Sequence, residues 1–153
     1  MSLYLVQHGK SLPKEMDADQ GLSDEGIADV KRIADVSKSY GVRVHSILHS
    51  GKKRARQTAE IFASALGPEK GVGERSGINP MDDVAVVAGA LLNKENLMLV
   101  GHLPFMERLA SYLITGSPGK RVIKFQNGGV VCLDQEPESP SWYIKWALMP
   151  KID

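Results

Sequence analysis

Two histidines in this sequence each follow a short apolar run and have a glycine as a direct neighbour. His8 comes after the run Leu3–Val6, and His102 comes after Leu97–Val100. If these runs are neighbouring parallel strands, both imidazoles project from the carboxyl edge of the sheet, where ligands bind in open α/β sheets. The adjacent glycines let the backbone turn sharply and let a ligand approach. The alternative is a pair of unrelated loop histidines.

A basic segment beginning at Ser50 could supply the binding partner of an anion at the same edge. Its first turns carry four cations: Lys52, Lys53, Arg54 and Arg56. A helix N-terminus offers free N–H groups and a positive dipole end to an anion. Helical spacing prevents all four side chains from facing one way, so we expect one or two to reach the site and Lys53 and Arg56 to face solvent. Together with the two histidines, this segment predicts a phosphate site with a nucleophile.

The elements that must position these residues alternate along the chain. Apolar runs predict strands at 3–6, 42–48, 97–100, 130–133 and 142–146, the last two forming a hairpin, and residues 71–80 hold at most a short strand before a loop. Helical spacing and end signals predict helices from Ser23 to Gly41, Lys53 to Leu66, Asp82 or Asp83 to about Leu92, and Pro104 to Gly116. This alternation predicts a three-layer α/β/α sandwich, with a mainly parallel central sheet and an antiparallel edge strand.

Length and composition exclude several classes of protein. The chain has 153 residues, of which 42% are hydrophobic and 24% charged, as expected for one globular domain spanning residues 1–153. A net charge of +1 gives no overall field to hold nucleic acid or an anionic membrane, so neither is an expected partner. The single cysteine, Cys132, excludes an internal disulfide, and its apolar surroundings predict a buried, inert thiol. No apolar run approaches the roughly 20 residues of a membrane span, so we expect a soluble, cytoplasmic protein.

Two other patterns are weaker. Gly-Lys-Ser at 9–11 suggests a P-loop, but that motif needs a glycine where Tyr4 stands, so we reject it. His45 and His49 lie four residues apart and share a face if both belong to one strand. With no carboxylate or cysteine close to them in sequence, we expect no zinc there.

Four short blocks resemble the motifs of the histidine phosphatase superfamily, in the family's order. Residues 5–11 (Leu-Val-Gln-His-Gly-Lys-Ser) resemble its Arg-His-Gly signature, and 21–26 resemble its Leu-Thr-x-x-Gly helix start. Residues 50–60 and 100–104 are similar to its later blocks. The small size and the segment Ile78–Asp83 resemble the compact SixA-type phosphohistidine phosphatases. This resemblance implies a phosphoglycerate mutase-like fold.

The resemblance also implies roles for individual residues. His8 would be the nucleophile that accepts the phosphoryl group, and His102 would donate to that group in the transition state. Arg54 would bind phosphate through its guanidinium fork. The other residues expected to contact substrate are Gln7, Lys10, Ser11 and Asn79. The covalent route needs no metal and no cofactor.

At one position the chain departs from the family. Gln7 stands where the family has arginine directly before its nucleophile. An amide donates hydrogen bonds but carries no charge, so the loss is roughly 2–4 kcal/mol, or about 30- to 1000-fold in rate. Lys10, Lys52 or Arg56 are candidates to replace that charge in part.

The general acid is not fixed by the motifs. Glu74, Asp82 and Asp83 are the candidates, although helix capping suits the aspartate pair better. A phosphoramidate nitrogen is protonated more readily than an ester oxygen, and short connections leave no room for a lid. Both features favour a phosphohistidine on another protein as substrate. The alternatives are a phosphate- or phosphoprotein-binding module with little turnover, and a small-molecule phosphomonoesterase.

Overall fold

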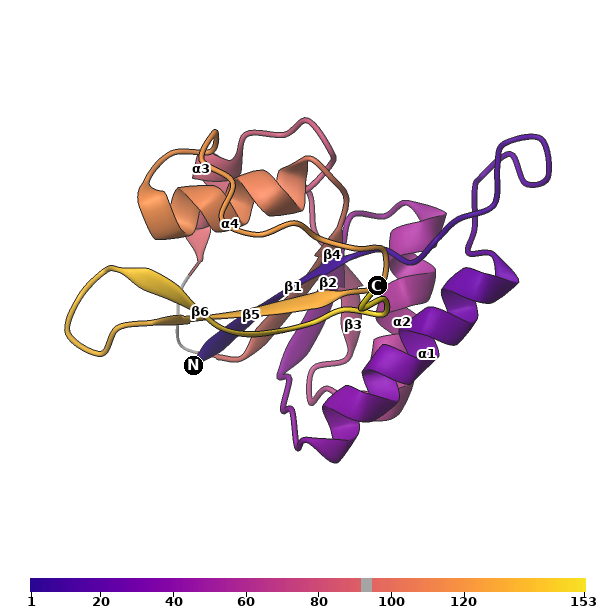
Figure 1. The fold of residues 1–153 in the computed structure, drawn as a ribbon, viewed down its shortest axis with the longest axis horizontal. Coiled ribbons are helices and arrows are strands. Elements are labelled where there is room, and N and C mark those ends of the chain that lie inside the picture. The colour runs from indigo at the N-terminus through magenta and orange to yellow at the C-terminus, as the bar shows by residue number, and fades with distance from the viewer. Residues whose placement is uncertain (92–94) are drawn as a thin grey trace.

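The computed structural model describes residues 1–91 and 95–153, and within them a central sheet lies between two layers of helices (Figure 1). The strands are β1 (Ser2–Gln7), β2 (Ser46–His49), β3 (Val72–Glu74), β4 (Leu97–Gly101), β5 (Val130–Gln135) and β6 (Trp142–Leu148). The helices are α1 (Asp24–Ser39), α2 (Lys53–Leu66), α3 (Val84–Ala90) and α4 (Phe105–Thr115).

The sheet has the strand order β3-β2-β4-β1-β5-β6. Strands β3, β2, β4 and β1 pair in parallel, β5 runs antiparallel to β1, and β6 runs antiparallel to β5. The antiparallel pairing is thus confined to one edge. The predicted α/β fold with a mainly parallel sheet is confirmed.

Both faces of the central strands β1 and β4 are buried, because helices cover both sides of the sheet. Tyr4 and Val6 of β1 face a core that includes Val30 of α1 and Phe62 of α2. Leu5, one position along, faces a second core formed with α3 and α4. The predicted burial of Cys132 is also confirmed, and burial raises the pKa of its thiol. None of the helices in the described ranges has the length and apolar character needed to cross a bilayer.

Local chemistry sets the helix ends, as the sequence predicts. Ser23 caps α1 by accepting from the Gly26 backbone N–H (3.0 Å), and Asp83 caps α3 in the same way through Ala85. Helix α2 ends at Gly67, whose φ of 56° is the left-handed conformation that glycine adopts at no steric cost. The predicted end of the third helix near Leu92 lies outside the described residues.

The prediction of a strand over 42–48 is wrong for its first four residues. Strand β2 begins at Ser46, and before it the N–H of Val42 donates to Ser37 and that of His45 to Asn96. Val44 is nevertheless buried. Its alternation with polar neighbours therefore reflects packing under a loop and not pairing in the sheet.

Candidate active site

Three parallel strands end at the same edge of the sheet and position the site. Gln7 of β1 stands opposite Gly101 of β4 in the ladder, and the N–H of His8 donates to the Gly101 carbonyl (2.9 Å). His8 and His102 are therefore the residues that follow paired positions on neighbouring strands. Ser50 follows β2 on the other side of β4. The condition for the two imidazoles to project from one edge, that their strands are neighbours, is met.

The structure brings together the three residues predicted to be catalytic. The ring centroids of His8 and His102 are 5.0 Å apart, with the planes tilted by 53°. Arg54, in the first turn of α2, donates from Nε to His8 Nε2 (3.3 Å). A guanidinium and two imidazoles therefore meet at one point on the sheet edge.

Hydrogen bonds define the tautomer of His8. Its Nδ1 lies 2.7 Å from the Gly9 carbonyl, which can only accept, so Nδ1 carries the proton. In the neutral ring, Nε2 then holds the lone pair, in agreement with its role as acceptor from Arg54. The lone pair of the candidate nucleophile thus points at a cationic group that can bind an anion.

The peptide unit between His8 and Gly9 is held at both ends. Asn127 Nδ2 donates to the His8 carbonyl (3.0 Å), and the Gly9 N–H donates to Thr58 Oγ1 (3.0 Å). Thr58 in turn donates to the Arg54 carbonyl (2.8 Å). The next carbonyl in the chain, that of Gly9, accepts from His8 Nδ1. Contacts that hold this peptide therefore also fix the direction of the His8 ring.

His102 is almost fully buried, with 1% of its surface exposed. Its Nε2 shares a hydrogen bond with Ser50 Oγ (2.6 Å), and its Nδ1 has no hydrogen-bond partner among the residues described. A buried ring nitrogen without a hydrogen-bond partner costs free energy.

Burial keeps both imidazoles neutral near pH 7. It lowers the pKa of His8 to about 4, a shift to which the positive charge of Arg54 adds and which the Gly9 carbonyl opposes. Burial, followed by the nearby His8 and Arg54, lowers the pKa of His102 to about 3. Desolvation also lowers the pKa of Arg54, but a guanidinium stays charged at neutral pH. The site therefore combines one fixed cation with two uncharged rings.

Gln7 lies at the end of β1 and is 9% exposed. Its carbonyl accepts from the Gly128 N–H (2.9 Å), whereas its side-chain Oε1 is buried without a partner in the described part of the chain. At the position where the family has arginine, this chain thus holds an uncharged amide whose side-chain oxygen accepts no hydrogen bond from the described residues.

The other predicted substrate contacts, Lys10, Ser11 and Asn79, have partners outside the two rings. Lys10 is exposed and pairs with Glu25 of α1 (2.7 Å), and Ser11 forms a bridge with Leu22. Asn79 is exposed in a turn, where its N–H donates to Asp82 (2.8 Å).

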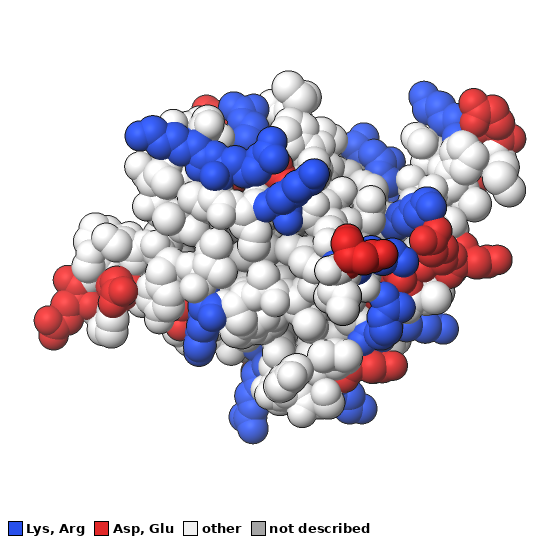
Figure 2. Space-filling view, in the orientation of Figure 1, with Lys and Arg blue, Asp and Glu red and all other residues white. Residues whose placement is uncertain are grey.

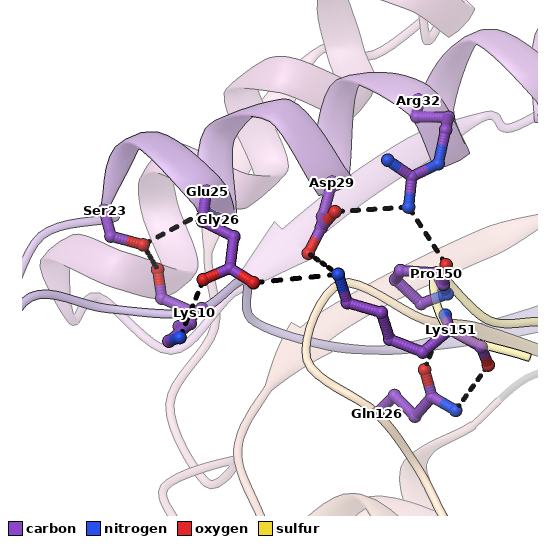
Figure 3. Close-up of polar contacts among 9 residues, drawn as sticks. All are labelled: Lys10, Ser23, Glu25, Gly26, Asp29, Arg32, Gln126, Pro150 and Lys151. Carbon is purple, nitrogen blue, oxygen red and sulfur yellow. Dashed lines mark hydrogen bonds and ion pairs between the residues drawn. The ribbon is translucent and has the colours of Figure 1, made fainter. Parts of the chain in front are cut away.

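The C-terminal segment is tied to α1 beside Lys10 (Figure 3). The side chain of Gln126 bonds twice to the backbone of Lys151, as donor and as acceptor, both at 2.9 Å. Lys151 Nζ lies 3.6 Å from Glu25, and Arg32 donates to the Pro150 carbonyl (2.9 Å). We call these contacts the C-terminal clamp. They hold Gln126, and the next residue, Asn127, donates to the His8 carbonyl.

The Lys53 side chain is 35% exposed and engaged in an ion pair, so the expectation that it faces solvent holds only in part. Its Nζ pairs with Asp17 (2.8 Å), because the loop before α1 folds over the start of α2. Lys53 and two backbone N–H groups lower the pKa of Asp17 to about 2. Arg56 is exposed, as expected, with Glu60 at 3.8 Å, and Lys52 is exposed at the N-cap of α2.

The three candidate acids differ in what they contact. Asp83 caps α3 and Asp82 closes the turn at Asn79. Glu74, at the end of β3, lies against Gly51, so that a side chain at position 51 would collide with its carboxylate. Glu74 is therefore the candidate acid nearest the loop that carries Ser50.

Sequence reasoning missed the supporting roles of Ser50, Thr58 and Asn127. Ser50 and Thr58 lie inside a motif block, which was the only available signal for them. Asn127 contacts His8 from 119 residues away, in a segment with no motif.

His45 and His49 do not belong to one strand, because β2 begins at Ser46. His45 precedes β2, and its ring nitrogens lie 2.9 Å from Glu69 and 3.1 Å from Glu95. His49 Nδ1 accepts from the Gly51 N–H (3.0 Å). Across residues 1–91 and 95–153, no three His, Cys, Asp or Glu side chains are grouped to hold a metal ion.

Comparison with known proteins shows the family to which the chain belongs. The family model of the histidine phosphatase superfamily (branch 1) matches residues 3–79. An uncharacterized protein of Picosynechococcus sp. is 31% identical over 142 residues, which span 87% of this chain and 84% of that protein.

Solved structures give the same result for the fold. The protein histidine phosphatase SixA complexed with tungstate superposes with a TM-score of 0.84 at 24% identity, over 98% of this chain and 97% of that one. A protein of Agrobacterium tumefaciens assigned as the phosphohistidine phosphatase SixA gives 0.76 at 26% identity, over 96% and 97%. This chain belongs to the histidine phosphatase superfamily.

Proposed function

We propose that this protein removes phosphate from phosphohistidine on another protein, through a phospho-His8 intermediate. The observation that carries the proposal is the hydrogen bond from Arg54 Nε to His8 Nε2 (3.3 Å), beside the ring of His102. It identifies the lone-pair nitrogen of His8 and sets a phosphate-binding fork next to it.

In the first step, the His8 Nε2 lone pair attacks phosphorus. A P–N bond forms to His8, the P–N bond to the substrate imidazole breaks, and the leaving nitrogen takes up a proton. Arg54 turns from Nε2 to the phosphoryl oxygens and neutralises part of their charge. The bound anion raises the pKa of His102, so that this ring donates to the phosphoryl group as negative charge develops.

In the second step, water attacks phospho-His8. Its oxygen bonds to phosphorus, the bond to Nε2 breaks and restores the lone pair, and inorganic phosphate leaves while one proton passes to solvent. Splitting the transfer into two displacements lowers the barrier of each.

Three features support a phosphohistidine substrate. The leaving imidazole demands less from a general acid, and the acid available here is Glu74 at the rim. His8 and Arg54 are partly exposed, so a side chain on a protein surface can reach them. The similar structure with tungstate is that of a protein histidine phosphatase.

The test compares a peptide phosphorylated on histidine with glucose 6-phosphate. We expect the peptide to be preferred in kcat/KM and labelled phosphate to appear on His8 in acid-labile form. His8→Ala should abolish both, whereas His45→Ala, a histidine at the opposite end of the strands, should leave both intact. Preference for the sugar phosphate would contradict the proposal and indicate a small-molecule phosphomonoesterase.

A binding module is the second candidate, because the buried side chain of Gln7 brings no charge to the site. The same labelling separates the two functions. Label that appears and decays supports turnover, and label that persists indicates a failed second step. Phosphate binding without label indicates the module.

A further inference from the structure

We propose that a basic face formed by Arg108, Lys120, Arg121 and Lys124 docks an acidic surface of the phosphorylated partner protein. We call it the α4 basic face. This inference rests on the proposed function, since it states which protein surface is recognised while phosphohistidine occupies the site.

The charge is concentrated in one stretch of sequence. Between Asn96 and Leu133 the chain has a single acidic residue, Glu107, and four basic residues, so this stretch carries +3 in a protein of net charge +1. Figure 2 shows Lys and Arg side chains gathered over α4 and the segment that follows it. The balanced composition of the whole chain conceals this local excess.

The one acidic residue in the stretch is already engaged. The Glu107 side chain is 15% exposed, lies 3.5 Å from Arg121, and accepts from the Phe125 N–H (2.9 Å). Arg108, Lys120 and Lys124 pair with no carboxylate among the residues that the structure describes, and both lysines are exposed. These three cations are available to a partner.

The face borders the site through a traceable path. After α4 the chain returns along that helix, where Phe125 bonds to Glu107, and then reaches the end of β1 (Figure 1). There Asn127 donates to the His8 carbonyl. Lys124 is therefore separated from the residue that holds the nucleophile by only two positions in the chain.

The two lysines on the α1 side of the nucleophile are paired with carboxylates. Lys10 and Lys151 share Glu25, and Lys151 also lies 3.8 Å from Asp29 (Figure 3). An acidic surface that approaches from the α4 side therefore meets cations without a carboxylate partner in the described ranges, whereas on the α1 side it meets cations already paired with Glu25 and Asp29. Such steering raises association rates by about 10- to 1000-fold at low salt.

The experiment uses two phosphohistidine peptides with the same central residues, one flanked by Asp and Glu and one by Lys. Wild-type protein should show about tenfold higher kcat/KM for the acidic peptide at low salt, and high salt should remove the difference. The triple variant Lys120→Glu, Arg121→Glu, Lys124→Glu should reverse the preference while hydrolysis of free phosphoramidate stays unchanged.

A control triple variant has the same change in net charge on a different surface. Lys31→Glu, Lys38→Glu, Arg43→Glu alters exposed residues on α1 and the loop after it and should retain the preference for the acidic peptide. Equal effects of the two triple variants would overturn the docking face and leave only a net-charge effect. Binding to phosphatidylglycerol vesicles through this face, with unchanged peptide turnover, would overturn it in favour of a membrane surface.

Docking and chemistry can fail separately. If wild-type protein hydrolyses neither peptide nor phosphoramidate, the proposed function fails. Peptide binding to the His8→Ala variant, measured by fluorescence anisotropy, then decides docking alone. Equal affinity for the two peptides would contradict it.

Discussion

At the scale of single residues, the site differs from its family's pattern in charge more than in shape. Arg54 supplies the cation that contacts His8. Gln7, the residue directly before the nucleophile, is an amide whose buried Oε1 has no partner among the described residues. Lys10, a candidate for replacing the missing charge, pairs with Glu25 instead. Arg54 is therefore the cation that contacts the nucleophile, while the charge of the exposed Lys52 reaches the ring of His102 and, after burial, contributes to lowering its pKa.

Gln7→Arg should restore a second fork. We expect formation of phospho-His8 to accelerate by about 30- to 1000-fold, because a charge-assisted contact to the phosphoryl oxygens stabilises the transition state by roughly 2–4 kcal/mol. Rapid-quench measurement of acid-labile label gives the rate. Gln7→Met, of similar size and without an amide, serves as control and should not accelerate the step. An unchanged rate in Gln7→Arg would show that position 7 does not face the phosphoryl group.

Asn127→Ala should lower kcat with little change in KM. The variant removes one of two hydrogen bonds to the His8 carbonyl and leaves only that from the Gly128 N–H (3.2 Å). This loosens the peptide next to the Gly9 carbonyl, which holds Nδ1, so the ring samples the other tautomer. Nitrogen NMR shifts of the His8 ring report the tautomer directly. Asn96→Ala is the matched control, since it removes an amide that bridges Ser2 and Arg43 at the far end of the strands. An unaltered tautomer in Asn127→Ala would contradict this positioning role.

At the scale of elements, local signals predicted most of the fold. Ser23 and Gly67 mark helix ends because their effects act within one turn of helix. The sequence could not give the length of β2, since Val44 is buried by tertiary packing without entering the sheet. The same limit applied to the site: motifs predicted His8 and His102, whereas the contact of Asn127 depends on the path of the chain after α4.

Helix α1 is coupled to the segment after the nucleophile through its N-cap. Ser23 accepts from the Gly26 N–H and donates to the Lys10 carbonyl (3.1 Å). Ser23→Ala should therefore lower the free energy of unfolding by about 1 kcal/mol, which a urea titration measures. Ser39→Ala, at the exposed end of the same helix, should lower the free energy of unfolding by a smaller amount. Equal losses in the two variants would mean that the cap contributes nothing specific.

At the scale of the whole molecule, burying two neutral imidazoles makes stability depend on pH. In the unfolded chain a histidine titrates near 6.5, whereas the folded protein holds the pKa of His8 at about 4 and that of His102 at about 3. Between pH 6.5 and about 4 the unfolded state thus binds more protons, so the free energy of unfolding falls as the pH is lowered through this window.

His102→Gln should reduce that slope. The change removes one of the two groups, each of which contributes on the order of 1 kcal/mol per pH unit. Urea titrations at several pH values between 6.5 and 4.5 measure the slope. Ile33→Val is the control, because it destabilises the core by packing alone and should shift every point equally. A slope that stays the same in His102→Gln would contradict the assignment.

The C-terminal clamp also bears on how this protein is best handled. Gln126 and Lys151 join the last residues to the loop that supports the nucleophile, whereas the amino group of Met1 lies near Asp134. An affinity tag or fluorescent fusion joined after Asp153 would lie close to these contacts. The leading end, at the start of β1, offers an attachment point on the side of the sheet away from the two rings, and recombinant material should carry its tag there.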